Sequence, residues 1–87
     1  MAYEVRLKPS AQRALRKLPA QVRSRIGSRL DGLGSNPRPP GCEKLGSVDD
    51  LYRIRAGDYR VVYQVLDAVL VVLVVTIGHR GDVYRRL

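Results

Sequence analysis

The sequence predicts an α+β domain in which a helical hairpin packs on an antiparallel sheet. Apolar and polar residues alternate near the start of the chain and again after residue 50, which is typical of half-buried strands. Between these segments apolar residues recur at helical spacing, and short turn sequences later divide the strand-like region into hairpins. With 87 residues, 45% of them hydrophobic, the chain is expected to form a single domain, 1–87.

The chain is expected to begin with a short strand followed by a helix. Over residues 3–8, Tyr3, Val5 and Leu7 share one face of the strand, and charged side chains occupy the other. Pro9 stops the strand and can open a helix at its first turn. The apolar positions of this helix are Ala11, Ala14, Leu15 and Leu18.

A second helix is expected after Pro19, which ends the first helix and suits the first turn of the next. Its apolar stripe consists of Val22, Ile26, Leu30 and Leu33. Gly27 lies within this helix and costs roughly 1 kcal/mol relative to alanine. Residues 34–37 close the helix, and the prolines that follow predict a stiff loop. The two apolar stripes need a sheet on which they can be buried.

Three strands are expected over residues 51–56, 59–66 and 69–77, separated by two-residue turns that indicate antiparallel hairpins. The third strand carries no charged residue, which predicts that it lies centrally or is covered on both faces. A short helix over residues 82–87 is expected to end the chain.

The first hairpin contains an unusual concentration of arginine. With Gly57 and Asp58 as its turn, Arg55 lies directly opposite Arg60, and Arg53 shares their face because side chains alternate along a strand. The other face, predicted to meet the core, carries Tyr52, Ile54, Tyr59, Val61 and Tyr63. Directly opposed like charges destabilise a sheet, so these arginines either extend into water or hold an anion.

The second hairpin is expected to bring the end of the chain to the arginine face. A turn at residues 67–68 places Arg60 opposite Val75, near the end of the third strand. The following segment then falls beside the arginines. The predicted cleft is lined by Arg53, Arg55, Arg60, Arg80 and Tyr84.

The net charge points to an acidic partner. Sixteen basic and eight acidic residues give +8, which exceeds what solubility requires, and RNA or DNA is the commonest partner of such a surface. One cysteine and one histidine exclude a disulfide framework and a zinc site within the chain. No signal peptide precedes the first strand, and the apolar run over residues 68–77 is about half the ~20 residues that span a bilayer. A soluble, cytoplasmic protein is therefore expected, with no membrane contact.

Several stretches of the sequence resemble one toxin family. "DLYRIRAGDYRVVYQVLD", followed by "VTIGHRGDVY", is similar to the RelE/ParE toxin superfamily and in particular to its RelE branch. The opening "YEVRLKPSAQRALRKLP" is similar to the first strand and helix of that family, so the resemblance spans nearly the whole chain. It implies a compact α+β fold and a ribosome-dependent endonuclease that cuts mRNA in the A site. The 2′-hydroxyl would attack the adjacent phosphate without metal or other cofactor and leave a 2′,3′-cyclic phosphate.

The resemblance also implies roles for individual residues. Arg60 matches the arginine that stabilises the reacting phosphate, and Arg80 matches a downstream arginine that stabilises charge or donates a proton. Tyr84 matches a tyrosine that stacks on a base or orients the attacking group. Arg53 and Arg55 stand where the best-characterised RelE members have two lysines, the second of which is their proposed general base.

Arginine at the second of these positions leaves the general base open. An arginine side chain has a pKa above about 12.5 and is almost never neutral at pH 7, whereas a lysine can be shifted toward neutrality. Arg55 is therefore expected to act as a transition-state clamp. Either the ribosome supplies the base, or His79 does, or catalysis is weak. A lone histidine at a strand end is also commonly structural.

Other basic residues are expected to contact RNA phosphates, although each could be an ordinary solvated cation. These are Arg53, Lys44, Arg13, Arg16, Lys17, Arg23 and Arg25. The resemblance further implies an acidic, RelB-like antitoxin that masks the basic cleft, in addition to the ribosome and mRNA as partners. Two other functions stay open: a ParE-like protein that poisons DNA gyrase by binding, and a basic module that binds RNA or ribosomes without cutting. The arginines at positions 53 and 55 favour the RelE interpretation over the ParE one.

Overall fold

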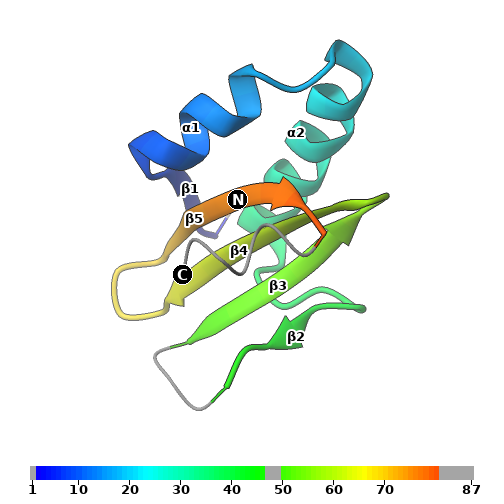
Figure 1. Cartoon of the computed structure of the whole chain (residues 1–87). Coiled ribbons are helices and arrows are strands. Elements are labelled where there is room, and N and C mark those ends of the chain that lie inside the picture. Colours follow the sequence, from blue (N-terminus) through cyan, green and yellow to red (C-terminus); the bar gives the residue numbers. More distant parts are fainter. Residues whose placement is uncertain (1, 47–49, 81–87) are drawn as a thin grey trace.

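The computed structural model describes residues 2–46 and 50–80 and confirms an α+β fold (Figure 1). Its elements are β1 Glu4–Leu7, α1 Pro9–Arg16, α2 Ala20–Ser35, β2 Glu43–Lys44, β3 Leu51–Ala56, β4 Tyr59–Leu66 and β5 Val71–His79. The strand β2 was not anticipated from the sequence. The helix expected over residues 82–87 lies outside the described residues.

The five strands form one mixed sheet in the order β1-β5-β4-β3-β2. Strand β5 lies between β1 and β4, as its uncharged sequence predicts. The expectation of a purely antiparallel sheet is wrong at one edge, because β1 pairs with β5 in parallel. The Glu4 amide donates to the Leu70 carbonyl and the Lys8 amide to the Val74 carbonyl, each at 2.9 Å. No local pattern signals this pairing, because the two strands are separated by most of the chain.

Both helices cover the same face of the sheet (Figure 1). Helix α1 begins at Pro9, as expected, and α2 buries Ile26, Leu30 and Leu33 of its predicted stripe. The guanidinium of Arg23 donates to the carbonyls of Arg16 and Leu18 and so satisfies acceptors at the end of α1. Among the described residues, no helix is both long and apolar enough to cross a membrane.

The core lies between the helices and one face of the sheet. Tyr63 is fully buried at its centre, and its ring stacks on that of Tyr52 with centroids 5.9 Å apart. The Tyr63 hydroxyl donates to the carbonyl of Pro37 at 2.8 Å, which satisfies the buried polar atom. Burial raises the pKa of Tyr63 well above its ordinary value. The prediction that Ile54 and Val61 share this face is also confirmed.

The turn between β4 and β5 differs from the prediction. It spans residues 67–70 instead of two residues, and Leu66 pairs with Val71 across it. Leu70 adopts a positive φ of 54°, a conformation that residues other than glycine rarely take. The prediction from Asp67 and Ala68 therefore made the turn two residues too short and the following strand begin too soon.

The pairing of β4 with β5 also contains an irregularity. The register shifts between Val62 and Tyr63, where one extra residue of β5 forms a β-bulge. The longer turn and the bulge together place Arg60 opposite Gly78. The predicted pairing of Arg60 with Val75 is therefore wrong, although the expectation that Arg60 lies near the end of β5 is confirmed.

Candidate functional site

The arginines of the first hairpin lie on the sheet face opposite to the helices. As predicted, Arg55 pairs directly with Arg60 across β3 and β4, and Arg53 shares their face by strand alternation. Arg53, Arg55, Arg60 and Arg80 are called the arginine cluster below. Gly57 adopts a φ of +63° in the first position of the two-residue turn, which glycine takes without strain.

Arginines from three parts of the chain meet the turn at residues 57–58, two through their side chains and one through its backbone amide. The Nη1 atom of Arg60 donates to the carbonyls of Gly57 and Tyr59, each at 3.2 Å. The backbone amide of Arg80 donates to the carbonyl of Asp58 at 2.8 Å, which ties the segment after β5 to the same turn. Arg25 of α2 reaches the turn from the helix side, because its Nη1 would lie 3.0 Å from a Cβ built on Gly57.

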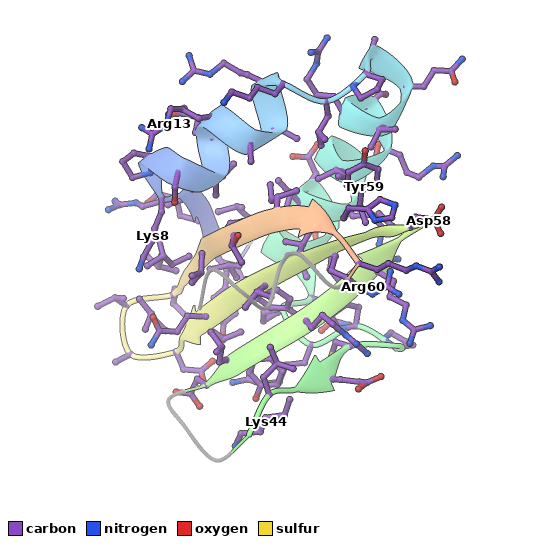
Figure 2. All side chains as sticks on the ribbon, viewed as in Figure 1. Lys8, Arg13, Lys44, Asp58, Tyr59 and Arg60 are labelled. Carbon is purple, nitrogen blue, oxygen red and sulfur yellow. The ribbon has the colours of Figure 1, made fainter. Side chains whose placement is uncertain are left out.

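The members of the arginine cluster have different surroundings. Arg53 forms an ion pair with Glu43 of β2, and only 12% of its side chain is exposed. Arg55 is exposed, and Arg60 is half-buried beside the turn. Figure 2 shows Arg60 at the tip of the hairpin next to Asp58. The face is not uniformly polar, since Val62 and Thr76 are buried on it.

The remaining predicted catalytic residues fall into two groups. Arg80 is brought to the cluster through its backbone, whereas Tyr84 lies outside the described residues. His79 pairs with Tyr59 on the helix face, with ring centroids 5.5 Å apart and planes at 83°. The bulge causes this placement, because regular alternation from Val74 would turn His79 to the arginine face. The sheet therefore separates His79 from Arg55 and Arg60.

The other predicted RNA-binding residues do not form one patch. Arg23 holds the end of α1 and Arg25 meets the β3–β4 turn, as described above. Lys44 is exposed on β2 and pairs with Tyr52 at the start of β3, far along the strand from the turn. Helix α1 carries Arg13 and Arg16, and Lys17 caps its C-terminal end; all three are exposed. Of these, Arg13 and Lys17 line a cavity, and Arg16 does not.

This cavity was not anticipated from the sequence. It has a volume of about 430 Å³ and lies between α1 and the ends of β4 and β5. Its lining includes Ser10, Arg13, Lys17, Tyr59 and His79, with Leu18 and Ile77 among its apolar residues. It is called the α1 cavity below. Because it lies on the helix side of the sheet, it is distinct from the arginine cluster.

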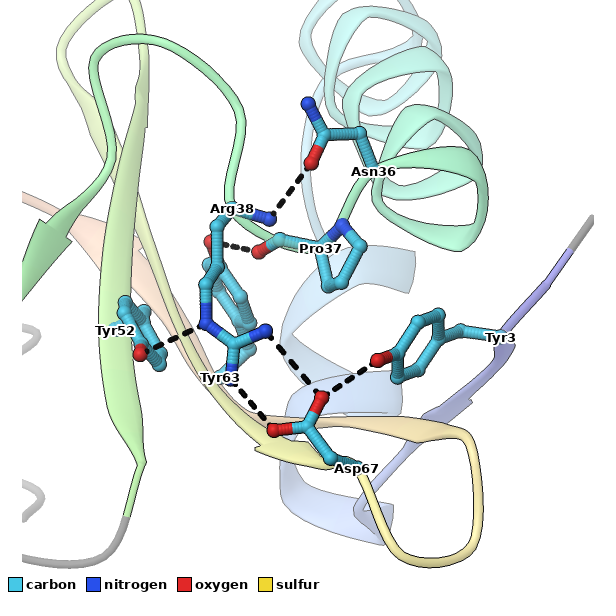
Figure 3. Close-up of polar contacts among 7 residues, drawn as sticks. All are labelled: Tyr3, Asn36, Pro37, Arg38, Tyr52, Tyr63 and Asp67. Atoms are coloured by element: carbon cyan, nitrogen blue, oxygen red, sulfur yellow. Dashed lines mark hydrogen bonds and ion pairs between the residues drawn. The ribbon is translucent and has the colours of Figure 1, made fainter.

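A second feature absent from the sequence predictions is a polar network around Arg38, in the loop after α2 (Figure 3). The Arg38 guanidinium donates to both carboxylate oxygens of Asp67, at 2.7 and 3.3 Å, and through Nε to the Tyr52 hydroxyl at 2.9 Å. The Tyr3 hydroxyl donates to the same carboxylate at 2.5 Å. The network therefore ties the loop to the residue before β1, to β3 and to the β4–β5 turn.

The network shifts the pKa values of its members in opposite directions. The hydrogen bond from Arg38 lowers the pKa of Asp67, and the one from Tyr3 lowers it further. Donation to Asp67 raises the pKa of Tyr3. Nothing in the sequence marked Arg38 for this role, because its partners are distant along the chain and it lies in a proline-rich loop. Its position indicates a structural role, away from the arginine cluster.

Comparison with known proteins shows the family to which this chain belongs. The family model described as ParE toxin of the type II toxin-antitoxin system matches residues 5–84. The mRNA interferase toxin RelE of Escherichia coli K12 is 36% identical over 88 residues, which cover 97% of this chain and 92% of that protein.

Solved structures of similar proteins share the fold. The archaeal RelE–RelB complex from Pyrococcus horikoshii contains a chain with a TM-score of 0.84 and 36% identity, covering 93% of this chain and 98% of that one. The intact RelBE toxin-antitoxin complex of E. coli gives a TM-score of 0.80 at 34% identity, covering 92% and 99%. The fold, the sequence identity and the family match agree over nearly the full length, so this chain belongs to the RelE branch of the RelE/ParE superfamily of type II toxins.

Proposed function

We propose that this toxin inhibits translation by cutting mRNA in the A site of the ribosome. The similar E. coli protein is named an mRNA interferase, which supports RNA cleavage as the activity. The observation that carries the proposal is the direct pairing of Arg55 with Arg60, beside a turn that also anchors Arg80. Such a set of cations suits a reacting phosphodiester, whose charge increases in the transition state.

In the proposed reaction the 2′-oxygen of the nucleotide before the scissile bond attacks the adjacent phosphorus. The 5′-oxygen of the next nucleotide leaves, and the products are a 2′,3′-cyclic phosphate and a 5′-hydroxyl. The guanidinium groups of Arg55 and Arg60 can each offer two parallel hydrogen bonds to the phosphoryl oxygens. Arg80 would stabilise charge on the leaving oxygen as the bond breaks, and a proton from water would then complete the 5′-hydroxyl.

The proton of the attacking hydroxyl needs an acceptor. The arginines stay protonated at neutral pH and cannot serve. His79 faces the helices on the other side of the sheet, so its position argues against it as the base. We therefore assign proton removal to the bound RNA or the ribosome, and the arginine cluster acts by orienting and stabilising the phosphate. Tyr84 would orient the attacking nucleotide, as the family resemblance implies.

The test is cleavage of a defined mRNA on purified translating ribosomes, with the product ends mapped. Arg60→Ala and Arg80→Ala should each lower the cleavage rate roughly 10²- to 10³-fold, the usual cost of removing one preorganised donor. Arg29→Ala is the matched control, since Arg29 is an exposed cation on α2. Both cluster variants should keep the circular dichroism spectrum of the parent protein. Full activity in both would remove the mechanism.

We also propose that an acidic, RelB-like antitoxin binds this chain and masks its basic surface. The structures to which it is similar are toxin-antitoxin complexes, and its charge of +8 favours an acidic partner. Co-expression with the product of an adjacent gene should relieve growth arrest and yield a stable complex. A chain that is harmless alone would argue against both proposals.

A second candidate function is gyrase poisoning by binding, without RNA chemistry. The matching family model carries the ParE name, and this branch is the one that the sequence resemblance associates with gyrase. A supercoiling assay run beside the ribosome assay separates the two. Inhibited supercoiling with intact mRNA would choose the second candidate.

A further inference from the structure

The α1 cavity combines a cationic rim with an apolar floor. Arg13 of α1 and Lys17, the residue that caps the C-terminal end of this helix, lie four positions apart and line the same cavity, with Ser10 one turn before Arg13. Like charges at this spacing repel and weaken a helix, and an anion between them removes that repulsion. Among the described residues that line the cavity, none is acidic. The site is therefore complementary to a negatively charged group.

Two aromatic rings on the sheet side of the cavity add a surface on which a planar ligand can pack. Tyr59 and His79 both line it, and they meet edge to face with centroids 5.5 Å apart. Because the rings are nearly perpendicular, one can present a face to a planar ligand while the other supports it. A volume of about 430 Å³ lies within the range of small-molecule sites. Phosphate-binding cations beside an aromatic platform are the features that hold a nucleotide of single-stranded RNA.

The cavity and the arginine cluster meet at the end of the sheet. Tyr59 lines the cavity, and the next residue, Arg60, points to the opposite face. Gly78 lines the cavity and is also the strand partner of Arg60. Figure 2 shows Tyr59 and Arg60 at the same end of the β3–β4 hairpin, near Asp58. An RNA strand that passes around the sheet end can therefore touch both sites.

We propose that the α1 cavity is a second RNA-contact site, which holds one nucleotide by its phosphate between Arg13 and Lys17 and by its base against the Tyr59–His79 pair. This inference rests on the proposed action on RNA but assigns the cavity a binding role, separate from cleavage. The nucleotide can come from messenger or ribosomal RNA, because the recognised chemistry is the same.

The experiment uses the full chain without ribosomes, so it does not depend on cleavage. His79 is the only histidine in the sequence, and its ring protons give separate NMR signals that report directly on the cavity. Titration with uridine 5′-monophosphate and with hexauridylate should shift these signals saturably. Inorganic phosphate should bind more weakly, because it cannot stack.

The variant Arg13→Gln/Lys17→Gln should raise the dissociation constant for hexauridylate roughly tenfold and reduce its log–log salt slope by about 0.7, the loss of one single-strand phosphate contact. Lys8→Gln/Arg29→Gln is the charge-matched control, because both are exposed cations that do not line the cavity, and it should keep the affinity for hexauridylate within about twofold. All four residues are exposed, so both variants should fold.

Two further binding measurements, with vacant ribosomes and with a polyglutamate peptide, distinguish the possible ligands. If the cavity variant loses affinity for vacant ribosomes more than for free RNA, the bound nucleotide is ribosomal, and the reverse result identifies the messenger. Hexauridylate binding that leaves the His79 signals unmoved would overturn the inference. So would a polyglutamate peptide that shifts them while RNA does not, since the cavity would then serve an acidic protein. If the protein does not cut mRNA on ribosomes but RNA still shifts the His79 signals, the result counts against the proposed nuclease activity and not against the binding site.

Discussion

The two faces of the β3–β4 hairpin are formed by alternate residues of the same two strands, yet one face is apolar and buried and the other carries the arginines. On the helix face, Ile54, Val61 and Tyr63 are almost completely buried and form the centre of the core. On the other face, Arg55 lies opposite Arg60 against the usual preference for unlike cross-strand pairs. Ile54 lies between Arg53 and Arg55, and Val61 directly follows Arg60, so core residues are direct neighbours of residues in the proposed site. A substitution can remove one property and leave the other.

The largest effect is expected from the helix face. Ile26 of α2 is fully buried against this face, and Ile26→Ala should lower the free energy of unfolding by about 2–5 kcal/mol through lost burial and a cavity. Arg55→Ala, the matched change on the other face, should leave stability unchanged or raise it slightly, because a like-charge pair is removed. Urea unfolding measures both. Equal losses would mean that the two faces are not energetically separate.

A substitution on the arginine face can introduce a side chain that loses its proton near neutral pH, which would make cleavage depend on pH. Arg55→Lys keeps the positive charge, but a lysine beside other cations can lose its proton near neutrality. Ribosome-dependent cleavage should become about tenfold faster at high pH than at low pH, within the range of general base catalysis. Arg53→Lys, at the position paired with Glu43, should leave the pH profile of the parent protein unchanged. Identical profiles for both variants would show that position 55 does not approach the attacking hydroxyl.

A smaller effect is expected within the helices that cover the sheet. Gly27 lies inside α2, and a Cβ built there meets nothing within 4 Å. Gly27→Ala should therefore stabilise the protein by up to about 1 kcal/mol through helix propensity. Thermal unfolding followed by circular dichroism measures the gain. A loss would mean that the added methyl group meets a neighbouring group, against the open space at this position.

The smallest effect concerns the network that ties the helix face to the turn after β4. Because the pKa of Asp67 is lowered by Arg38, its contribution to stability is full above its unfolded pKa of about 3.9 and is lost as the pH falls through the lower folded pKa. Melting temperatures of the parent protein and Asp67→Asn should differ by a constant amount from pH 7 to about 5. The difference should shrink below about pH 4. A constant difference down to pH 2 would exclude the ionised carboxylate as its source.

The elements that could be predicted were those with strong local signals. Periodic apolar residues located both helices, and Gly57 fixed the first hairpin and hence the opposition of Arg55 and Arg60. The prediction of the second hairpin was wrong in its turn length, because the turn depends on Leu70 at a positive φ, which residue propensities do not anticipate. The parallel pairing of β1 with β5 was hidden for a different reason, since it depends on contacts between distant segments.

The candidate site was predictable to the extent that it follows from alternation within one hairpin. The placement of Arg60 and Arg80 near one turn came from the order of the strands, whereas the position of His79 depended on a bulge that no residue signals. The α1 cavity requires the relative position of a helix and a strand end, so Tyr59 was recognised only as a core residue. Arg38 was missed because an ion pair between distant loops leaves no pattern in the sequence.

The bulge in β5 also has a consequence for the lengths that this strand can tolerate. In a regular strand, the gain or loss of one residue moves every following side chain to the other face of the sheet. Here the residue between Val74 and Thr76 is the surplus one, so its deletion would leave a regular ladder. Ile77 would stay in the core and Arg80 beside the turn. Relatives that differ by one residue in this strand can therefore be aligned with a gap at position 75 without any change in the orientation of the residues that follow.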